Sequence, residues 1–110
     1  MLVNLWDETL QALKDNSFTL NGVKYICNAE GNVEMATFAT SAENYWYDNE
    51  SDEIGVDPTL CVVGSHWWLS RVRYKGVEKW MFHKKPLKPT IGHREFIVNM
   101  KRPPGTLKEF

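Results

Sequence analysis

Apolar residues recur at helical spacing near the start of the chain. Asn4 stands in position to cap a helix, Asp7 lies in the first turn, where a carboxylate favours the helix N-terminus, and Asp15-Asn16 ends the run. The pattern therefore predicts a helix over residues 4–15. Its buried stripe is expected to contain Leu5, Trp6, Leu10 and Leu13.

A second segment, VEMATFATSAENYWYDN, carries apolar residues at i, i+3, i+4, i+7, i+10 and i+11. This spacing predicts a helix over about residues 33–46, with Asn32 in position to cap it. The threonines and aromatic residues also suit a strand, so both interpretations stay open. The helix would bury Met35, Phe38, Ala39, Ala42, Tyr45 and Trp46.

Between these segments, SFTLNGVKYIC contains the pair Asn21-Gly22. Both residues tolerate positive φ, which makes the pair the most favourable two-residue hairpin turn. Pairing outward from the turn brings the apolar residues of both arms onto one face. The sequence thus predicts a hairpin with a buried face of Phe18, Leu20, Val23, Tyr25 and Cys27.

A second hairpin is predicted in HWWLSRVRYKGVEKWMFHKK, residues 66–85, with Lys75-Gly76 as its turn. A two-residue loop sets Arg71 opposite Trp80 and Arg73 opposite Glu78. One face then carries Trp68, Val72, Tyr74, Val77 and Met81. The other carries Trp67, Leu69, Arg71, Arg73, Glu78, Trp80 and Phe82.

The remaining segments complete an α+β pattern. LCVVG is a short apolar strand, NESDEIGVDP an acidic loop, KKPLKPTIG a connection, and REFIVNM a last strand. We expect a single compact domain over residues 1–110, with an antiparallel sheet of five or six strands and two helices. Residues 101–110 form a polar C-terminal tail that Pro103-Pro104 keeps out of a central strand.

Composition supports this picture. Of the 110 residues, 43% are hydrophobic and 25% charged, which is typical of a folded chain with one core. The N-terminus lacks the basic region of a signal peptide, and no apolar run approaches the roughly 20 residues of a membrane span. We therefore predict a cytoplasmic protein in which Cys27 and Cys61 are buried thiols.

Charge is divided unevenly along the chain. Residues 1–60 carry eleven acidic side chains against two lysines, a net charge of −9, whereas residues 61–110 carry eleven basic against three acidic side chains, +8. An acidic and a basic face on one molecule permit head-to-tail self-association, and equally permit the two halves to pack on each other.

Catalytic and cofactor motifs are not found. The three histidines form no HxH or HExxH spacing, there is no GxSxG elbow, and no glycine-rich phosphate loop is present. The acidic loop departs from an EF-hand, because Glu53 stands where that loop needs glycine. We expect no cofactor and no metal, while a loose divalent site or a paired-carboxylate acid/base in this loop remains an alternative.

The hairpin permits two interpretations. In the structural one, Arg71 packs on Trp80 and Arg73 pairs with Glu78, so these residues satisfy each other. In the functional one, a base stacks on an exposed aromatic platform while cations meet phosphates. The candidate binding residues are Trp67, Arg71, Arg73, Trp80, Lys84 and Lys85.

Three function classes follow. The first is a non-catalytic binding module that occupies a macromolecular, most simply protein, partner, because the chain is rich in the residue types of interface hot spots. In general character, though in no specific motif, it resembles a small accessory or inhibitor protein of a phage or mobile element. The alternatives are nucleic-acid or nucleotide binding through residues 66–85, and an enzyme with an unfamiliar site. The acidic loop offers another partner surface, formed by Asp48, Glu50, Asp52, Glu53 and Asp57.

Overall fold

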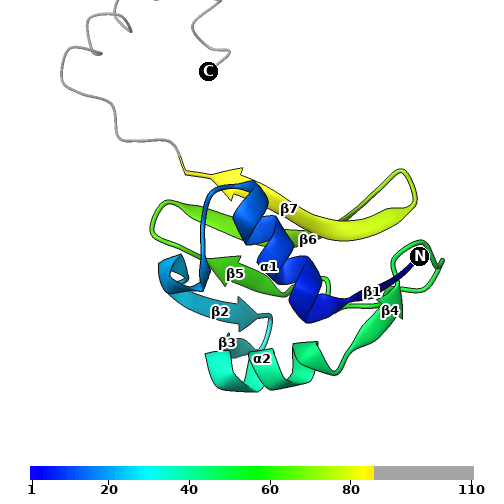
Figure 1. Cartoon of the computed structure of the whole chain (residues 1–110), viewed down its shortest axis with the longest axis horizontal. Helices are drawn as coiled ribbons and strands as arrows, with labels where there is room; N and C mark the ends of the chain where they lie inside the picture. The colour runs from blue at the N-terminus through cyan, green and yellow to red at the C-terminus, as the bar shows by residue number, and fades with distance from the viewer. Residues whose placement is uncertain (86–110) are drawn as a thin grey trace, which may run out of the picture.

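An antiparallel sheet of five strands, in the order β3-β2-β5-β6-β7, carries helix α1 on one face (Figure 1). The structure is a computed structural model and describes residues 1–85. Three predicted segments lie wholly or mostly outside these residues: the connection after the second hairpin, the strand at 94–100 and the tail at 101–110. The predicted α+β class, with two helices and an antiparallel sheet, is confirmed. The strands of the main sheet are β2 (Tyr25–Asn28), β3 (Gly31–Val33), β5 (Cys61–Val63), β6 (Trp67–Tyr74) and β7 (Val77–Lys84).

Helix α1 (Leu5–Asp15) begins where the sequence predicts. The Asn4 side chain accepts a hydrogen bond from the backbone N–H of Asp7 at 3.0 Å, which satisfies one of the free donors of the first turn. Leu5 and Leu13 are buried as predicted, together with Thr9. Trp6 and Leu10 are only partly buried, and Trp6 packs against Phe38 of the second helix.

The predicted hairpin at Asn21-Gly22 is wrong. These residues belong to a single 3₁₀ turn (η1, Leu20–Gly22), and the segment before them connects α1 to the sheet without becoming a strand. Strand β2 pairs with β3 and β5 instead. Its buried residue is Ile26, so the neighbouring Tyr25 faces outward, since adjacent strand residues lie on opposite sides of a sheet.

The second helix is shorter than predicted. Helix α2 (Met35–Glu43) buries Phe38 and Ala42, and Asn44 ends it. The chain then forms β4 (Trp46–Asp48), which pairs with β1 (Leu2–Asn4) in a separate two-stranded ribbon. The helix interpretation is therefore correct for the first part of this segment and the strand interpretation for its end. Pairing with β1 satisfies the backbone groups that would otherwise have continued the helix.

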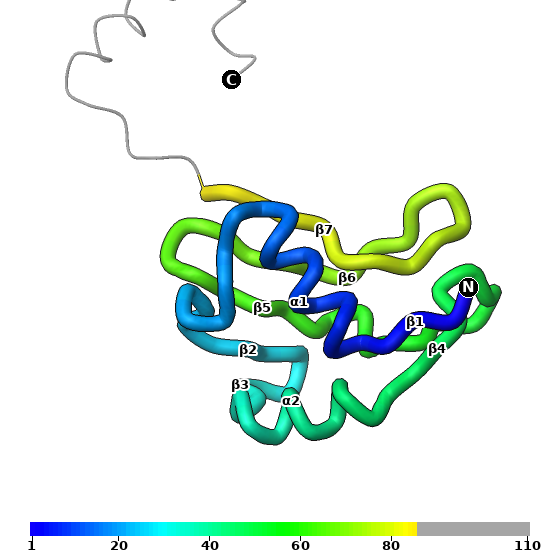
Figure 2. Tube along the Cα trace, viewed as in Figure 1, coloured from blue at the N-terminus to red at the C-terminus, as the bar shows by residue number. Residues whose placement is uncertain are grey.

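The second hairpin has the predicted register throughout. Lys75 and Gly76 have φ of 53° and 82°, as a primed two-residue turn requires. Arg71 lies opposite Trp80, and Arg73 lies opposite Glu78. The turn end of this hairpin approaches the loop after β4 and the N-terminus (Figure 2), and the Glu78 N–H donates to the Asn49 carbonyl at 2.7 Å.

Among residues 1–85, neither helix combines the length and the apolar character that crossing a membrane requires.

Candidate functional site

The predicted aromatic platform faces the interior. Helix α1 covers the sheet face that carries Trp67 and Trp80, which are only 4% and 7% exposed. Trp67 stacks on Phe18 with ring centroids 4.6 Å apart, and the Trp80 indole N–H donates to the Thr9 hydroxyl at 3.0 Å. The prediction of an exposed stacking surface on these two rings is therefore wrong. The hairpin faces were assigned correctly, but the face chosen for binding is the one that builds the core.

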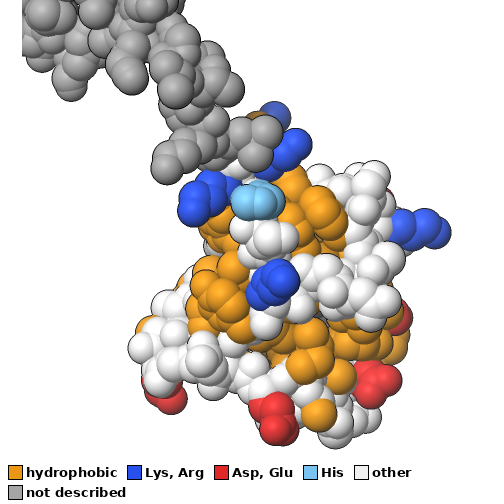
Figure 3. All heavy atoms as spheres, turned by 90° about the vertical axis from the view of Figure 1, so that its left-hand side faces the viewer, with side chains coloured by type: hydrophobic (Ala, Val, Ile, Leu, Met, Phe, Trp, Pro, Cys, Tyr) orange, Lys and Arg blue, Asp and Glu red, His pale blue; other side chains and the backbone are white. Residues whose placement is uncertain are grey.

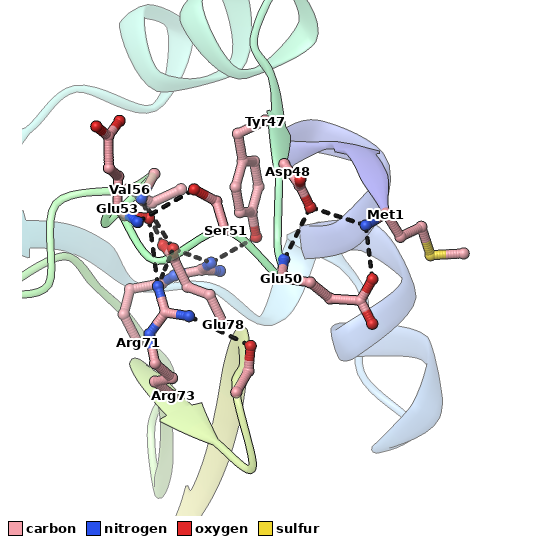
Figure 4. Close-up of polar contacts among 12 residues, drawn as sticks. Met1, Tyr47, Asp48, Glu50, Ser51, Glu53, Val56, Arg71, Arg73 and Glu78 are labelled. Atoms are coloured by element: carbon pink, nitrogen blue, oxygen red, sulfur yellow. Dashed lines mark hydrogen bonds and ion pairs between the residues drawn. The ribbon is translucent and has the colours of Figure 1, made fainter.

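Arg71 is also buried, at 7% exposure, and forms the centre of a charged cluster (Figure 4). Its guanidinium contacts Glu8 at 3.2 Å, the Tyr47 hydroxyl at 2.6 Å and Glu78 at 3.3 Å. It also lies 4.7 Å from the ring centroid of Trp80, which confirms the predicted cation–π pair. Desolvated charges of this kind are stable only when they are paired, as these are.

Glu78 ties this cluster to the acidic loop. Its carboxylate accepts hydrogen bonds from the backbone N–H groups of Gly55 and Val56 at 2.8 and 2.9 Å. Arg73 lies 3.6 Å from the same carboxylate, which confirms the predicted cross-strand ion pair. The cluster therefore holds the loop against the sheet, and the structural interpretation applies to Arg71 and Arg73.

Tyr47 gives this cluster a pH dependence. Burial and the hydrogen bond that its hydroxyl donates to Glu8 raise the pKa of Tyr47 above the usual tyrosine range. Because the fold favours the neutral phenol, the resulting stability is present below about pH 10, where unfolded tyrosine ionises, and is lost as the pH rises further. We expect the free energy of unfolding to fall more steeply between pH 9 and 11 in the wild type than in Tyr47→Phe.

Urea denaturation at several pH values measures this difference. The two proteins share all their other ionisable side chains, so only the difference between the two slopes is informative. Tyr74→Phe, which changes an exposed tyrosine, serves as the matched control and should reproduce the wild-type slope. Equal slopes for the wild type and Tyr47→Phe would contradict the prediction.

The carboxylates of the acidic loop are exposed but partly engaged. Asp48 and Glu50 each contact the N-terminal ammonium group at 2.8 Å, which lowers the pKa of Asp48. Asp57 accepts hydrogen bonds from the Thr59 backbone and hydroxyl, and these lower its pKa. Asp52 and Glu53 extend into solvent. Within residues 1–85, no three His, Cys, Asp or Glu side chains converge closely enough to hold a metal ion.

The sheet face opposite α1 is not covered by the residues that the structure describes, and we call it the open sheet face. Its strand partners align in rows across the sheet. Cys27 and Cys61 are direct cross-strand partners on this face. Both are free thiols, and they are half-buried, not buried as predicted. Burial raises the pKa of the Cys61 thiol. The first row is Tyr25, Val63, Trp68 and His83, and the second is Cys27, Cys61, Ser70 and Met81.

One end of the open sheet face is hollowed into a groove of about 650 Å³, the basic groove. Its cationic or protonatable side chains are Lys24, His66 and Lys85, and its exposed aromatic residues are Tyr25 and Trp68. Lys85 was a predicted binding residue and lies here. Lys84 is exposed beside it at the end of β7.

A second groove, of about 630 Å³, runs between α1, the β1–β4 ribbon and β7; we call it the acidic groove. Asp7, Glu8 and Asp15 line it together with Leu2 and Trp46. The end of the molecule seen in Figure 3 has its lysine and arginine side chains mainly in the upper part and its carboxylates in the lower part. At this end of residues 1–85, positive and negative side chains therefore lie mainly on separate parts of the surface.

The sequence did not identify two exposed aromatic residues that line these grooves, Trp46 and Tyr25. Trp46 was placed on a buried helix face, and Tyr25 on a buried hairpin face. Both assignments are wrong because the predicted second helix ends before Trp46 and the predicted hairpin that contained Tyr25 does not form. Trp68 was correctly separated from Trp67, and this was the available signal that the hairpin has a second aromatic face.

Comparison with known proteins finds no matching family model, no similar characterised protein and no similar solved structure.

Proposed function

We propose that this protein is a non-catalytic binding module that acts by occupying a protein partner, and that the partner docks in the acidic groove. The observation that carries the proposal is Trp46. Its side chain is 56% exposed beside the groove, and among the described residues it has neither a ring-stacking partner nor a hydrogen bond.

An exposed tryptophan of this kind contributes little to the fold but provides a large apolar surface for association. Tryptophan is enriched among the residues that carry most of the binding energy at interfaces. Leu2, which is also largely exposed, lines the same groove. Together they supply an apolar centre of the type that a docking side chain desolvates.

The charged side chains that line the acidic groove indicate which kind of partner protein it suits. Asp7 and Asp15 are exposed on the helix side of the groove, and Lys79 is the single cation among its described lining residues. A rim of mostly negative charge favours a basic partner surface and speeds its association. Glu8, the least exposed carboxylate of the groove, is held by Tyr47 and Arg71, which supports binding over acid–base chemistry.

Trp46→Ala tests the proposal. The wild-type protein, immobilised and exposed to lysate of the source cell, is expected to retain a basic protein that the variant loses. Removal of a central tryptophan should weaken the association by about 2 kcal/mol or more, roughly 30-fold. The captured protein is then purified and its affinity for both forms measured by calorimetry at two salt concentrations.

Tyr25→Ala is the matched control, because Tyr25 is a similarly exposed aromatic residue that does not line the acidic groove. It should bind the partner with wild-type affinity, and neither variant should shift the melting temperature appreciably. A partner that binds wild type and Trp46→Ala equally would place the docking surface elsewhere.

A further inference from the structure

Trp68 has an aromatic partner on only one of its two ring faces within residues 1–85. On that side the indole stacks on His83, with centroids 4.9 Å apart and an interplanar angle of 14°. This centroid distance equals the spacing of neighbouring strands. The two rings therefore stand perpendicular to the sheet, and each faces its partner on the neighbouring strand. The uncovered face of Trp68 therefore points toward Val63 and, beyond it, Tyr25.

The gap between these two aromatic residues suits one more ring. Tyr25 and Trp68 are both cross-strand partners of Val63 and so lie two strand spacings apart, about 9 to 10 Å. Val63 lies midway between them, and its short side chain lines the groove as the floor of this gap. A planar ring placed above Val63 lies about 4.5 to 5 Å from each aromatic residue, within the range of stacked aromatic pairs. Tyr25 and Trp68 are 50% and 36% exposed, so the ring can enter from solvent.

The charges around this gap favour an anion. Lys24, His66 and Lys85 line the groove, and none of its described lining residues is a carboxylate. Neither lysine forms an ion pair with another residue of 1–85. A planar aromatic ring joined to a phosphate is the ligand chemistry that matches both features.

We propose that the basic groove binds single-stranded nucleic acid, with one base between Tyr25 and Trp68 and the adjoining phosphates on Lys24 and Lys85. A volume of about 650 Å³ exceeds what one stacked base needs, which leaves room for neighbouring nucleotides. Duplex bases are stacked on each other and cannot enter the gap. This site is separate from the acidic groove, so the two proposals fail or stand independently.

The test measures binding of a fluorescently labelled 12-nucleotide single strand by anisotropy at several salt concentrations. Trp68→Ala and Tyr25→Ala are each expected to weaken binding about five- to 150-fold, the range for loss of one stacked base. Replacing Lys24 and Lys85 together by alanine should reduce the slope of log affinity against log salt by about 1.4, or 0.7 for each phosphate contact. A duplex of the same sequence should bind much more weakly.

Matched controls exclude general effects. Trp46→Ala removes an exposed tryptophan from the acidic groove, and Lys14→Ala removes an exposed lysine from α1; both should bind as the wild type does. Melting curves establish that each variant is folded. Because Tyr25 and Trp68 lie on the open sheet face, their replacement should leave the protein folded.

Three results would overturn the proposal. One is the absence of single-strand binding at 50 mM salt. Another is binding that the Trp68 and Tyr25 variants retain in full, which would reduce the interaction to charge alone. The third is adenosine monophosphate binding as tightly as the 12-nucleotide strand, which would assign the groove to a free nucleotide.

Discussion

Glu78→Ala is expected to lower the free energy of unfolding by about 3 to 5 kcal/mol, because removing one partner of a buried ion pair leaves the other charge uncompensated. The Arg71 guanidinium would lose its contact with the Glu78 carboxylate, and the N–H groups of Gly55 and Val56 would lose their acceptor. For a domain of this size the melting temperature should fall by at least about 12 °C.

Chemical denaturation of the variant measures this effect. Glu78→Gln keeps an acceptor for the loop N–H groups but lacks the charge, so its stability should lie between those of the wild type and Glu78→Ala. Glu30→Ala, which removes an exposed carboxylate, is the control and should change the stability by less than about 0.5 kcal/mol. A loss below 1 kcal/mol for Glu78→Ala would show that the cluster does not hold the loop.

Gly64→Ala is expected to destabilise the protein by about 2 to 4 kcal/mol through overpacking. A Cβ atom at this position would lie 2.5 Å from Cζ2 of Trp67 and closer still to two other atoms of the indole. Trp67 is buried and packs against both Phe18 and Phe82, so the ring cannot move aside without disturbing the core. Thermal and urea unfolding should both show the loss.

Gly22→Ala is the matched control for this substitution. A Cβ at Gly22 would meet Phe18 and the same Trp67 ring at 3.9 Å, which is ordinary van der Waals contact. Its stability should remain within about 1 kcal/mol of the wild type. If the two glycine variants are equally stable, the turn between β5 and β6 is able to open away from the indole.

Local sequence signals predicted the elements that depend on local physics. The cap at Asn4 and the spacing after it placed α1, because capping satisfies donors within one turn of the chain. Lys75-Gly76 set every cross-strand pair of the second hairpin, since a two-residue turn leaves no freedom of register. Arg71–Trp80 and Arg73–Glu78 followed from that register and were found.

The same kind of signal failed where no partner strand supported it. Asn21-Gly22 is a favourable hairpin turn, yet β2 has β3 and β5 as neighbours, and the residues before the turn are used to leave α1. Pairing with β1 likewise converted the end of the predicted second helix into β4. In both cases long-range hydrogen bonding outweighed a local preference.

The sequence by itself determined that the second hairpin has two distinct faces, but only the tertiary structure decided which face is buried. Both faces carry tryptophan, so alternation alone does not identify the core. Helix α1 lies on the face of Trp67 and Trp80, so these two predicted binding residues are buried in the core and Arg71 is buried with them. Trp68 and Tyr25 are exposed on the other face of the sheet. The choice rests on packing between segments far apart in the chain. The apolar stripe of α1 shares one core with that face, and the charge of Arg71 is offset there by Glu8 and Glu78.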